Sequence, residues 1–198
     1  EKVVEHCYDR EGNITEEVEV NMPDQKYLVS VEFANHLKTK PLEELCMRVL
    51  KMYFQYRLQE ELRGTQGAAY SVQVLGEATS IPRYQQELFI RFATSLDEGP
   101  RMRALVHEQI QEFLKQGLTD EEVEDFKKEK KSADELACNT IVFWMENLQF
   151  YNKTGKKMDA PMYFDAVIDK IKAKDVLAFA RKFFTTAQCV DLVIKSKR

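Results

Sequence analysis

Two segments near the start of the chain alternate apolar and polar residues with the period of a β-strand. Val18 and Val20 alternate with glutamates and an asparagine, and residues 27–34 repeat the pattern. The second run places four apolar side chains on one face, namely Tyr27, Val29, Val31 and Phe33. Pro23 and Asp24 supply a turn between the runs. We expect these strands to be joined as an antiparallel meander.

After Pro41 the apolar spacing changes to the period of an amphipathic helix. The apolar residues that carry this period are Leu42, Leu45, Cys46, Val49, Leu50 and Tyr53. They predict a helix that runs to about Leu62 and ends at a loop between Gly64 and Gly67. Residues 70–75 and 86–93 alternate again, so we predict two strands paired as a hairpin.

Helical spacing dominates the second half of the chain. Apolar residues between 105 and 114 mark a helix that Gly117 can end with a left-handed cap. Thr119 and Glu122 form a capping box that starts a further helix. We predict that helical structure extends to about Asn152, either without interruption or with one break. Residues 162–171 and 175–184 are predicted as short helices, and 189–194 as a final strand. This order predicts an α+β fold: a mostly antiparallel sheet with helices packed chiefly on one face.

Charge and hydrophobicity exclude several classes of function. The chain has 29 Lys plus Arg against 33 Asp plus Glu, so it lacks the positive excess that nucleic-acid binding needs. No apolar run approaches the roughly 20 residues of a membrane-spanning helix. The four cysteines are widely separated, which is more typical of buried free thiols than of disulfides. We therefore expect neither a nucleic-acid partner nor a membrane span.

The residues that most often carry catalysis form no recognisable set. His6, His36 and His107 are far apart, and none lies in an H-x-x-E-H or H-E-x-x-H motif. The sequence contains neither a phosphate-binding glycine loop nor a G-x-S-x-G elbow. We expect no catalytic residue, metal ligand or cofactor in this chain alone.

Two further stretches have an ordinary structural interpretation. The basic run from Lys127 to Lys131 follows several acidic residues at helical spacing, which is typical of a solvated helix face. The aromatic stretch around Trp144 is expected to pack against the sheet or against a neighbouring domain.

The segment from Arg63 to Tyr70 combines a cation at a helix end, a glycine-containing turn and a phenol that enters a strand. Such a junction presents a guanidinium and a hydroxyl at the same edge of a sheet. On local physics alone, the ordinary structural interpretation is favoured: Arg63 is a cation that complements the helix dipole, and Tyr70 is an ordinary strand aromatic.

At this segment the chain resembles the pitrilysin/insulinase-like zinc metallopeptidases, whose carboxy-terminal half carries an Arg, a loop with Gly, and a Tyr seven positions later. Arg63, Tyr70 and the following Ser71-Val72 match that pattern. Later stretches also resemble bacterial members: Gly117-Leu118-Thr119, Asn139, Phe143-Trp144-Met145, Tyr151 and Gly155. Gly64 departs from the family, where an acidic residue often follows the Arg. The family's zinc motif and its distal glutamate are absent.

The resemblance implies that residues 1–198 form a single carboxy-terminal half-domain, similar in fold to the mitochondrial processing peptidase-like domain and excised from a larger multi-domain peptidase. Zinc is then expected in a homologous zinc-binding half-domain, the partner of this one. Arg63 and Tyr70 are expected to bind the peptide substrate and its developing oxyanion. A periplasmic or other extracytoplasmic compartment is expected for the parent. A structural or assembly subunit, or a peptide-binding module that acts through an exposed sheet edge, remain alternatives.

Overall fold

The computed structural model describes residues 12–63, 69–79, 83–154 and 167–197. Within its helices and strands, only the backbone is described for residues 62, 63, 69–71, 150, 153 and 154. The elements, in chain order, are β1 (Ile14–Val20), β2 (Lys26–Asn35), α1 (Pro41–Arg63), β3 (Ala69–Thr79), β4 (Gln85–Ser95), α2 (Gly99–Gln116), α3 (Asp120–Ala137), α4 (Ile141–Thr154), α6 (Ala173–Thr186) and β5 (Gln188–Ser196).

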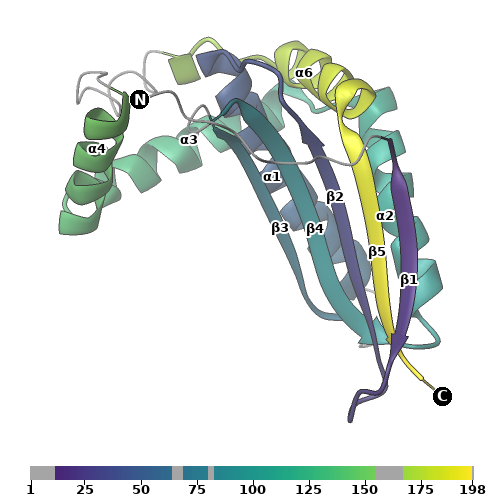
Figure 1. Ribbon diagram of the computed structural model, residues 1–198. Coiled ribbons are helices and arrows are strands. Elements are labelled where there is room, and N and C mark those ends of the chain that lie inside the picture. Colours follow the sequence, from purple (N-terminus) through teal and green to yellow (C-terminus); the bar gives the residue numbers. More distant parts are fainter. Residues whose placement is uncertain (1–11, 64–68, 80–82, 155–166, 198) are drawn as a thin grey trace.

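The strands form one five-stranded mixed sheet in the order β1-β5-β2-β4-β3 (Figure 1). The predicted hairpin of β3 and β4 is confirmed, with Val74 opposite Ile90. The predicted meander of the first two strands is wrong, because β5 lies between β1 and β2 and runs parallel to β1. Charge explains this order: β1 is rich in glutamate and suits an edge, whereas β5 buries Val193 in the interior.

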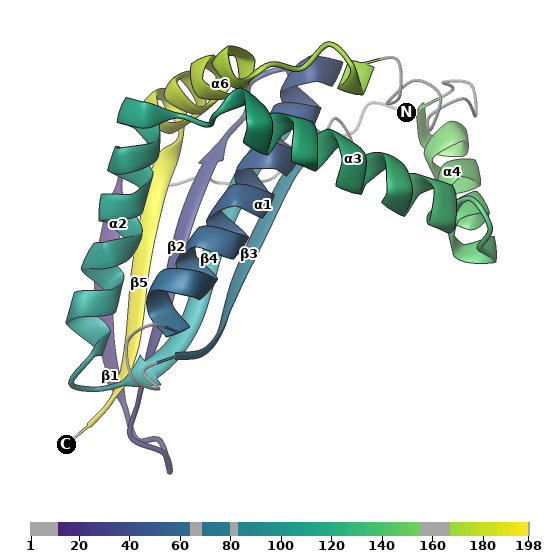
Figure 2. The same ribbon diagram turned by 180° about the vertical axis from the view of Figure 1, so that it is seen from behind.

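Helices α1, α2 and α6 cover one face of the sheet, as Figure 2 shows from behind. Alternate side chains of β2 and β4 point into this layer, and the helices add Leu50, Phe54, Phe113 and Phe183, each fully buried. The rings of Phe54 and Phe113 lie 5.5 Å apart between centroids. The prediction of an α+β fold with helices chiefly on one face is confirmed.

Gly117 ends α2 as predicted, but not in the left-handed helical conformation, because its φ of 70° is combined with a ψ of −153°. A β-carbon there would stand 3.2 Å from Leu177 Cδ2. The capping box predicted at Thr119 is present. The Thr119 hydroxyl accepts a hydrogen bond from the Glu122 N–H, and the Glu122 carboxylate accepts one from the Thr119 N–H. The following helical run breaks at residues 138–140 into α3 and α4.

Helices α3 and α4, here called the arm, extend from the body of the domain past the β3 edge, with α4 at the far end (Figures 1 and 2). The aromatic stretch of α4 does not pack on the sheet: 45% of Trp144 and 76% of Ile141 are exposed. Trp144 instead donates a hydrogen bond from Nε1 to the Cys138 carbonyl at 2.9 Å and contacts the Phe143 ring edge-on. The sequence allowed this stretch to pack either against the sheet or against a neighbouring domain. The first expectation is wrong, and packing against a neighbouring domain stays a prediction.

Candidate functional site

The junction of α1 and β3 holds the two residues that the sequence singled out. Arg63 is the last residue of α1, and Tyr70 is the second residue of β3. Both therefore lie at the end of the sheet where its edge strand β3 begins (Figure 1). Their side chains and the loop 64–68 lie outside the described residues, so the prediction that a guanidinium and a phenol face one another stays a prediction.

The backbone of β3 is irregular at Tyr70. Ala69 is paired with Thr94 and Val72 with Phe92, so two residues of β3 oppose a single residue of β4. This is the arrangement of a β-bulge, which re-aims the side chains of the bulged strand and is common beside binding sites. Regular pairing resumes at Val72, so the irregularity is confined to the residues around Tyr70.

A buried carboxylate ties β5 to α2. Asp191 is only 6% exposed, and its oxygens accept hydrogen bonds from Arg103 Nε at 2.9 and 3.0 Å. His107 Nε2 lies 2.9 Å from the same carboxylate. Burial raises the pKa of Asp191, but the hydrogen bonds of His107 and Arg103 outweigh it, so the pKa lies below its ordinary value. Arg103 and His107 are four residues apart and so share one flank of α2, but the sequence gives no sign of their common partner.

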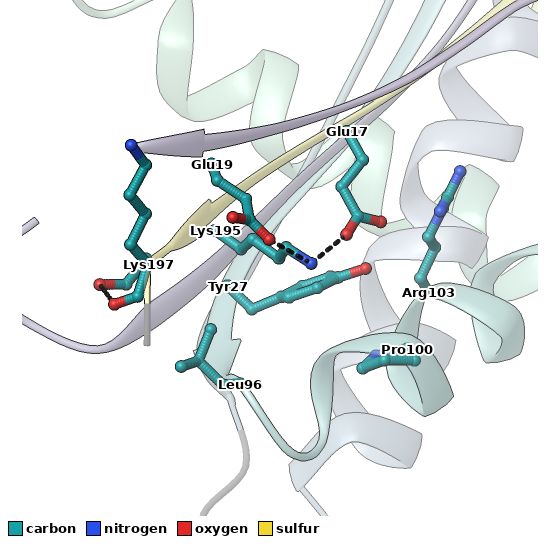
Figure 3. Close-up of a pocket in the computed structure, with 9 residues that line it drawn as sticks. Glu17, Glu19, Tyr27, Leu96, Pro100, Arg103, Lys195 and Lys197 are labelled. Atoms are coloured by element: carbon teal, nitrogen blue, oxygen red, sulfur yellow. Dashed lines mark hydrogen bonds and ion pairs between the residues drawn. The ribbon is translucent and has the colours of Figure 1, made fainter. Parts of the chain in front are cut away.

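Next to this cluster, a hollow of about 610 Å³ opens between β1, the end of β5 and the start of α2 (Figure 3). Lys195 lies between Glu17 Oε1, at 2.7 Å, and Glu19 Oε1, at 3.0 Å. The ring of Tyr27 lines the hollow. Burial, and secondly the negative charge of Glu17, raises the pKa of the Tyr27 hydroxyl. Each of these charges already has a partner inside the hollow. The arrangement stabilises the end of the sheet and presents no nucleophile with an adjacent base.

Metal-binding and nucleophilic residues are not gathered within the described part of the chain. No group of three or more His, Cys, Asp and Glu there could hold a metal ion, and His6 lies outside it. Burial raises the pKa of the Cys46 thiol to about 12 and that of Cys189 to about 11, so neither thiol ionises at neutral pH. None of the described helices has the length and apolar character needed to cross a membrane.

The arm carries an apolar surface that the rest of the described chain does not cover. Its exposed fractions are high for such side chains: 71% for Leu136, 53% for Met145 and 47% for Leu148. The remaining members are Ile141, Val142, Trp144 and Tyr151. Large apolar side chains that stay exposed together on one helical element are typical of a contact with another molecule or domain. The aromatic stretch in the sequence was the signal for this surface.

Comparisons with known proteins agree with this architecture. The model of the family described as peptidase M16 inactive domain matches residues 2–130. The peptidase M16 inactive domain of Pseudomonas fluorescens has a similar fold, with a TM-score of 0.76 and 17% identity over 98% of this chain and 46% of that one. The periplasmic protease PqqL of Escherichia coli gives a TM-score of 0.80 at 10% identity over 94% of this chain and 21% of that one.

A curated relative is 24% identical over 174 residues, which is 85% of this chain and 40% of the relative: the non-peptidase homolog YmxG of Helicobacter pylori. The chain thus spans less than half the length of each of these relatives. The bacterial sources agree with the resemblance found in the sequence.

Proposed function

Because this chain belongs to the peptidase M16 inactive-domain family, we propose that it is the substrate-binding half-domain of a zinc metalloendopeptidase. In the parent protein it closes over a homologous half-domain that carries the zinc, and it contributes Arg63 and Tyr70 to the bound peptide. The observation that supports this role most directly is the β-bulge at Tyr70, at the start of the edge strand and next to the helix end that carries Arg63.

The chemistry of the two side chains suits this role. Attack on a peptide carbonyl builds negative charge on its oxygen, and hydrogen-bond donors aimed at that oxygen lower the barrier. A phenol and a permanently charged guanidinium are both donors at neutral pH. Zinc in the other half-domain would supply the activated water. Tyr70 and Arg63 hold the substrate backbone and the oxyanion.

The exposed apolar side chains of the arm support the proposal that a second half-domain binds this one. These side chains need a covering surface, and the chain spans 46% of the similar Pseudomonas fluorescens structure, which leaves room for a second unit of comparable size. An interface with an apolar centre is what a stable pairing of two half-domains requires. We assign the arm to the contact with the zinc-bearing half-domain.

Substitutions in the parent protein test the role of Arg63 and Tyr70. Tyr70→Phe and Arg63→Ala are each expected to lower kcat by about 10²–10³, the usual effect of removing one oxyanion donor. Tyr84→Phe and Arg101→Ala are matched controls, since Tyr84 is exposed just before β4, at the opposite end of the β3–β4 hairpin from Tyr70, and the exposed Arg101 pairs with Glu98. Wild-type turnover of both test variants would refute the assignment.

A second candidate function is a structural or assembly role, which the similarity to a non-peptidase homolog favours. In that case the parent carries no zinc motif and cleaves no peptide, while the arm still binds the other half-domain. Zinc analysis and a peptidase assay of the parent separate the two candidates. Stoichiometric zinc together with cleavage supports the peptidase, and the absence of both supports the scaffold.

The similarity to a protease described as periplasmic supports an extracytoplasmic location for the parent. Fractionation of the native cells, followed by detection of the parent protein, tests this location. Recovery with the cytoplasmic fraction would contradict it.

A further inference from the structure

The part of β3 that follows Tyr70 is held from both sides. β3 is the last strand of the sheet and pairs only with β4, so its other side has no neighbouring strand. On that side the amide of Gln55, in α1, donates a hydrogen bond from Nε2 to the Val72 carbonyl at 2.8 Å. Its Oε1 accepts a second one from the Val74 N–H at 2.9 Å. Gln55 therefore supplies the two hydrogen bonds that a neighbouring strand would form at this point.

The two hydrogen bonds of Gln55, here called the Gln55 clamp, lie beside the β-bulge. Regular pairing of β3 with β4 resumes at Val72, directly after the irregular residues around Tyr70. Val72 follows Tyr70 by two residues, which is about 7 Å along a strand. Gln55 precedes Arg63 by eight residues, which is about 12 Å along a helix. The clamp thus joins the helix that carries Arg63 to the strand that carries Tyr70.

Other contacts hold α1 on the sheet independently of this clamp. Gly76 of β3 lies against α1, and a β-carbon there would stand 3.1 Å from Lys51 Cβ, one helical turn before Gln55. Phe54 and Leu58, which flank Gln55 in the helix, are fully buried in the interior. Because these contacts anchor α1, we expect a change at Gln55 to act on the first residues of β3 rather than on the whole fold.

The chemistry assigned to Arg63 and Tyr70 depends on their spacing. Two donors stabilise one developing oxyanion only when both reach it, and a misplacement of about 1 Å can lower turnover about a hundredfold. The ladder of β3 with β4 is irregular at Tyr70, and it constrains this edge strand from one side only. The Gln55 clamp adds a second constraint, and it comes from the helix whose last residue is Arg63.

We propose that Gln55 is a positioning residue for the reaction and holds Tyr70 at the distance from Arg63 that turnover requires. The proposal rests on the function proposed above for these two residues. Gln55 acts through them and not on the substrate, because Val72 and Val74 engage the donor and the acceptor of its amide. Loss of the clamp should therefore lower kcat with little effect on KM.

Substitution of Gln55 in the parent protein tests this role. Gln55→Leu removes both hydrogen bonds, and kcat should fall about tenfold to a hundredfold. Gln55→Glu provides a second test that does not depend on the folding of the leucine variant. A protonated carboxyl group can donate to the Val72 carbonyl and accept from the Val74 N–H as the amide does, whereas a carboxylate cannot donate. The kcat of Gln55→Glu, relative to the wild type at the same pH, should therefore rise as the pH falls.

Asn35→Leu is the matched control. Asn35 uses its amide in the same way, with Nδ2 donating to Thr186 Oγ1 and Oδ1 accepting from the Leu37 N–H, both at 3.1 Å. It is more deeply buried than Gln55 and lies at the opposite end of the sheet from Tyr70. Asn35→Leu should therefore lower the midpoint of thermal unfolding at least as much as Gln55→Leu but leave kcat unchanged.

A double-mutant cycle separates this proposal from the one on which it rests. If Gln55 acts through Tyr70, Gln55→Leu should lower kcat much less in the Tyr70→Phe background than in the wild type. Effects that multiply, or an equal loss of kcat in Asn35→Leu, would overturn the role of Gln55 alone, as would wild-type turnover of Gln55→Leu beside an impaired Tyr70→Phe. Wild-type turnover of both Tyr70→Phe and Arg63→Ala would overturn the proposed function, and the role of Gln55 with it.

Discussion

The body of the domain and the arm use the same kinds of apolar residue in opposite ways. Leu50 and Phe54 of α1 are fully buried against the sheet, whereas Leu148 and Ile141 of α4 are 47% and 76% exposed. Both helices are built from apolar residues at helical spacing. Apolar residues at helical spacing therefore predict that one face of a helix will be covered. They do not identify what covers it, whether the sheet of the same domain or the surface of another domain.

The arm is nevertheless a well-formed structure. A capping box begins α3, and ion pairs follow its polar side, among them Lys128 with Asp125 at 3.0 Å and Lys131 with Asp169 at 2.7 Å. Such exposed pairs each contribute only about 0–1 kcal/mol. Charged groups of the arm thus find partners within the described chain, whereas many of its apolar side chains are exposed to solvent. A helix with paired charges and exposed apolar side chains is typical of a segment that contacts another domain.

The largest expected difference between the two regions is the cost of removing a leucine. Leu50→Ala leaves a cavity in the packed interior and should lower the free energy of unfolding of the chain by about 3–5 kcal/mol. Leu148→Ala removes the same atoms from an exposed site and should cost less than about 0.5 kcal/mol. Urea denaturation of both variants measures this. Equal losses would mean that α4 is packed within the chain.

A smaller effect is expected at the buried ion cluster of the body. Asp191→Asn leaves Arg103 without its charge partner and should cost about 2–3 kcal/mol at neutral pH. Because the folded pKa of Asp191 lies below its unfolded value of about 3.9, its contribution is complete above that pH and is lost as pH falls through the folded pKa.

Unfolding measured as a function of pH checks the sign of this effect. The wild type should lose more stability than Asp191→Asn between about pH 5 and pH 2. Parallel acid profiles of the two proteins would show that Asp191 contributes nothing through its charge.

The smallest expected difference concerns two helix caps. Thr119→Ala removes the cap of α3, whose Val123 and Phe126 are buried against the body, and should cost about 1 kcal/mol. Thr140→Ala removes a hydroxyl that accepts from the Phe143 N–H in α4, and should leave the midpoint of thermal unfolding of the chain unchanged. A similar loss in both variants would show that α4 unfolds together with the body.

Much of the fold could be predicted because local patterns decide it. The period change at Pro41, the hairpin of β3 and β4, and the capping box at Thr119 all depend on neighbouring residues. The place of β5 between β1 and β2 could not be predicted, because alternation within a strand does not specify its neighbours. Asp191, the common partner of Arg103 and His107, could not be predicted either, because it lies more than 80 residues away in the sequence and no local pattern joins the three side chains.

The candidate site is predictable only in its position along the chain. The order of helix end, glycine turn and strand placed Arg63 and Tyr70 at one end of β3, and the backbone agrees. The bulge at Tyr70 had no signal in the sequence, since its signature is a pairing register between two strands. Whether the two side chains meet a substrate depends on the parent's other half-domain.

Hydrogen–deuterium exchange of the arm tests the pairing of half-domains most directly. In the parent protein, the amides of α4 (Ile141–Thr154) should be strongly protected, whereas in the separately produced 198-residue chain they should exchange rapidly. The amides of α1 should be equally protected in both proteins. Rapid exchange of α4 in the parent as well would contradict the account, because it would show that no half-domain covers the arm.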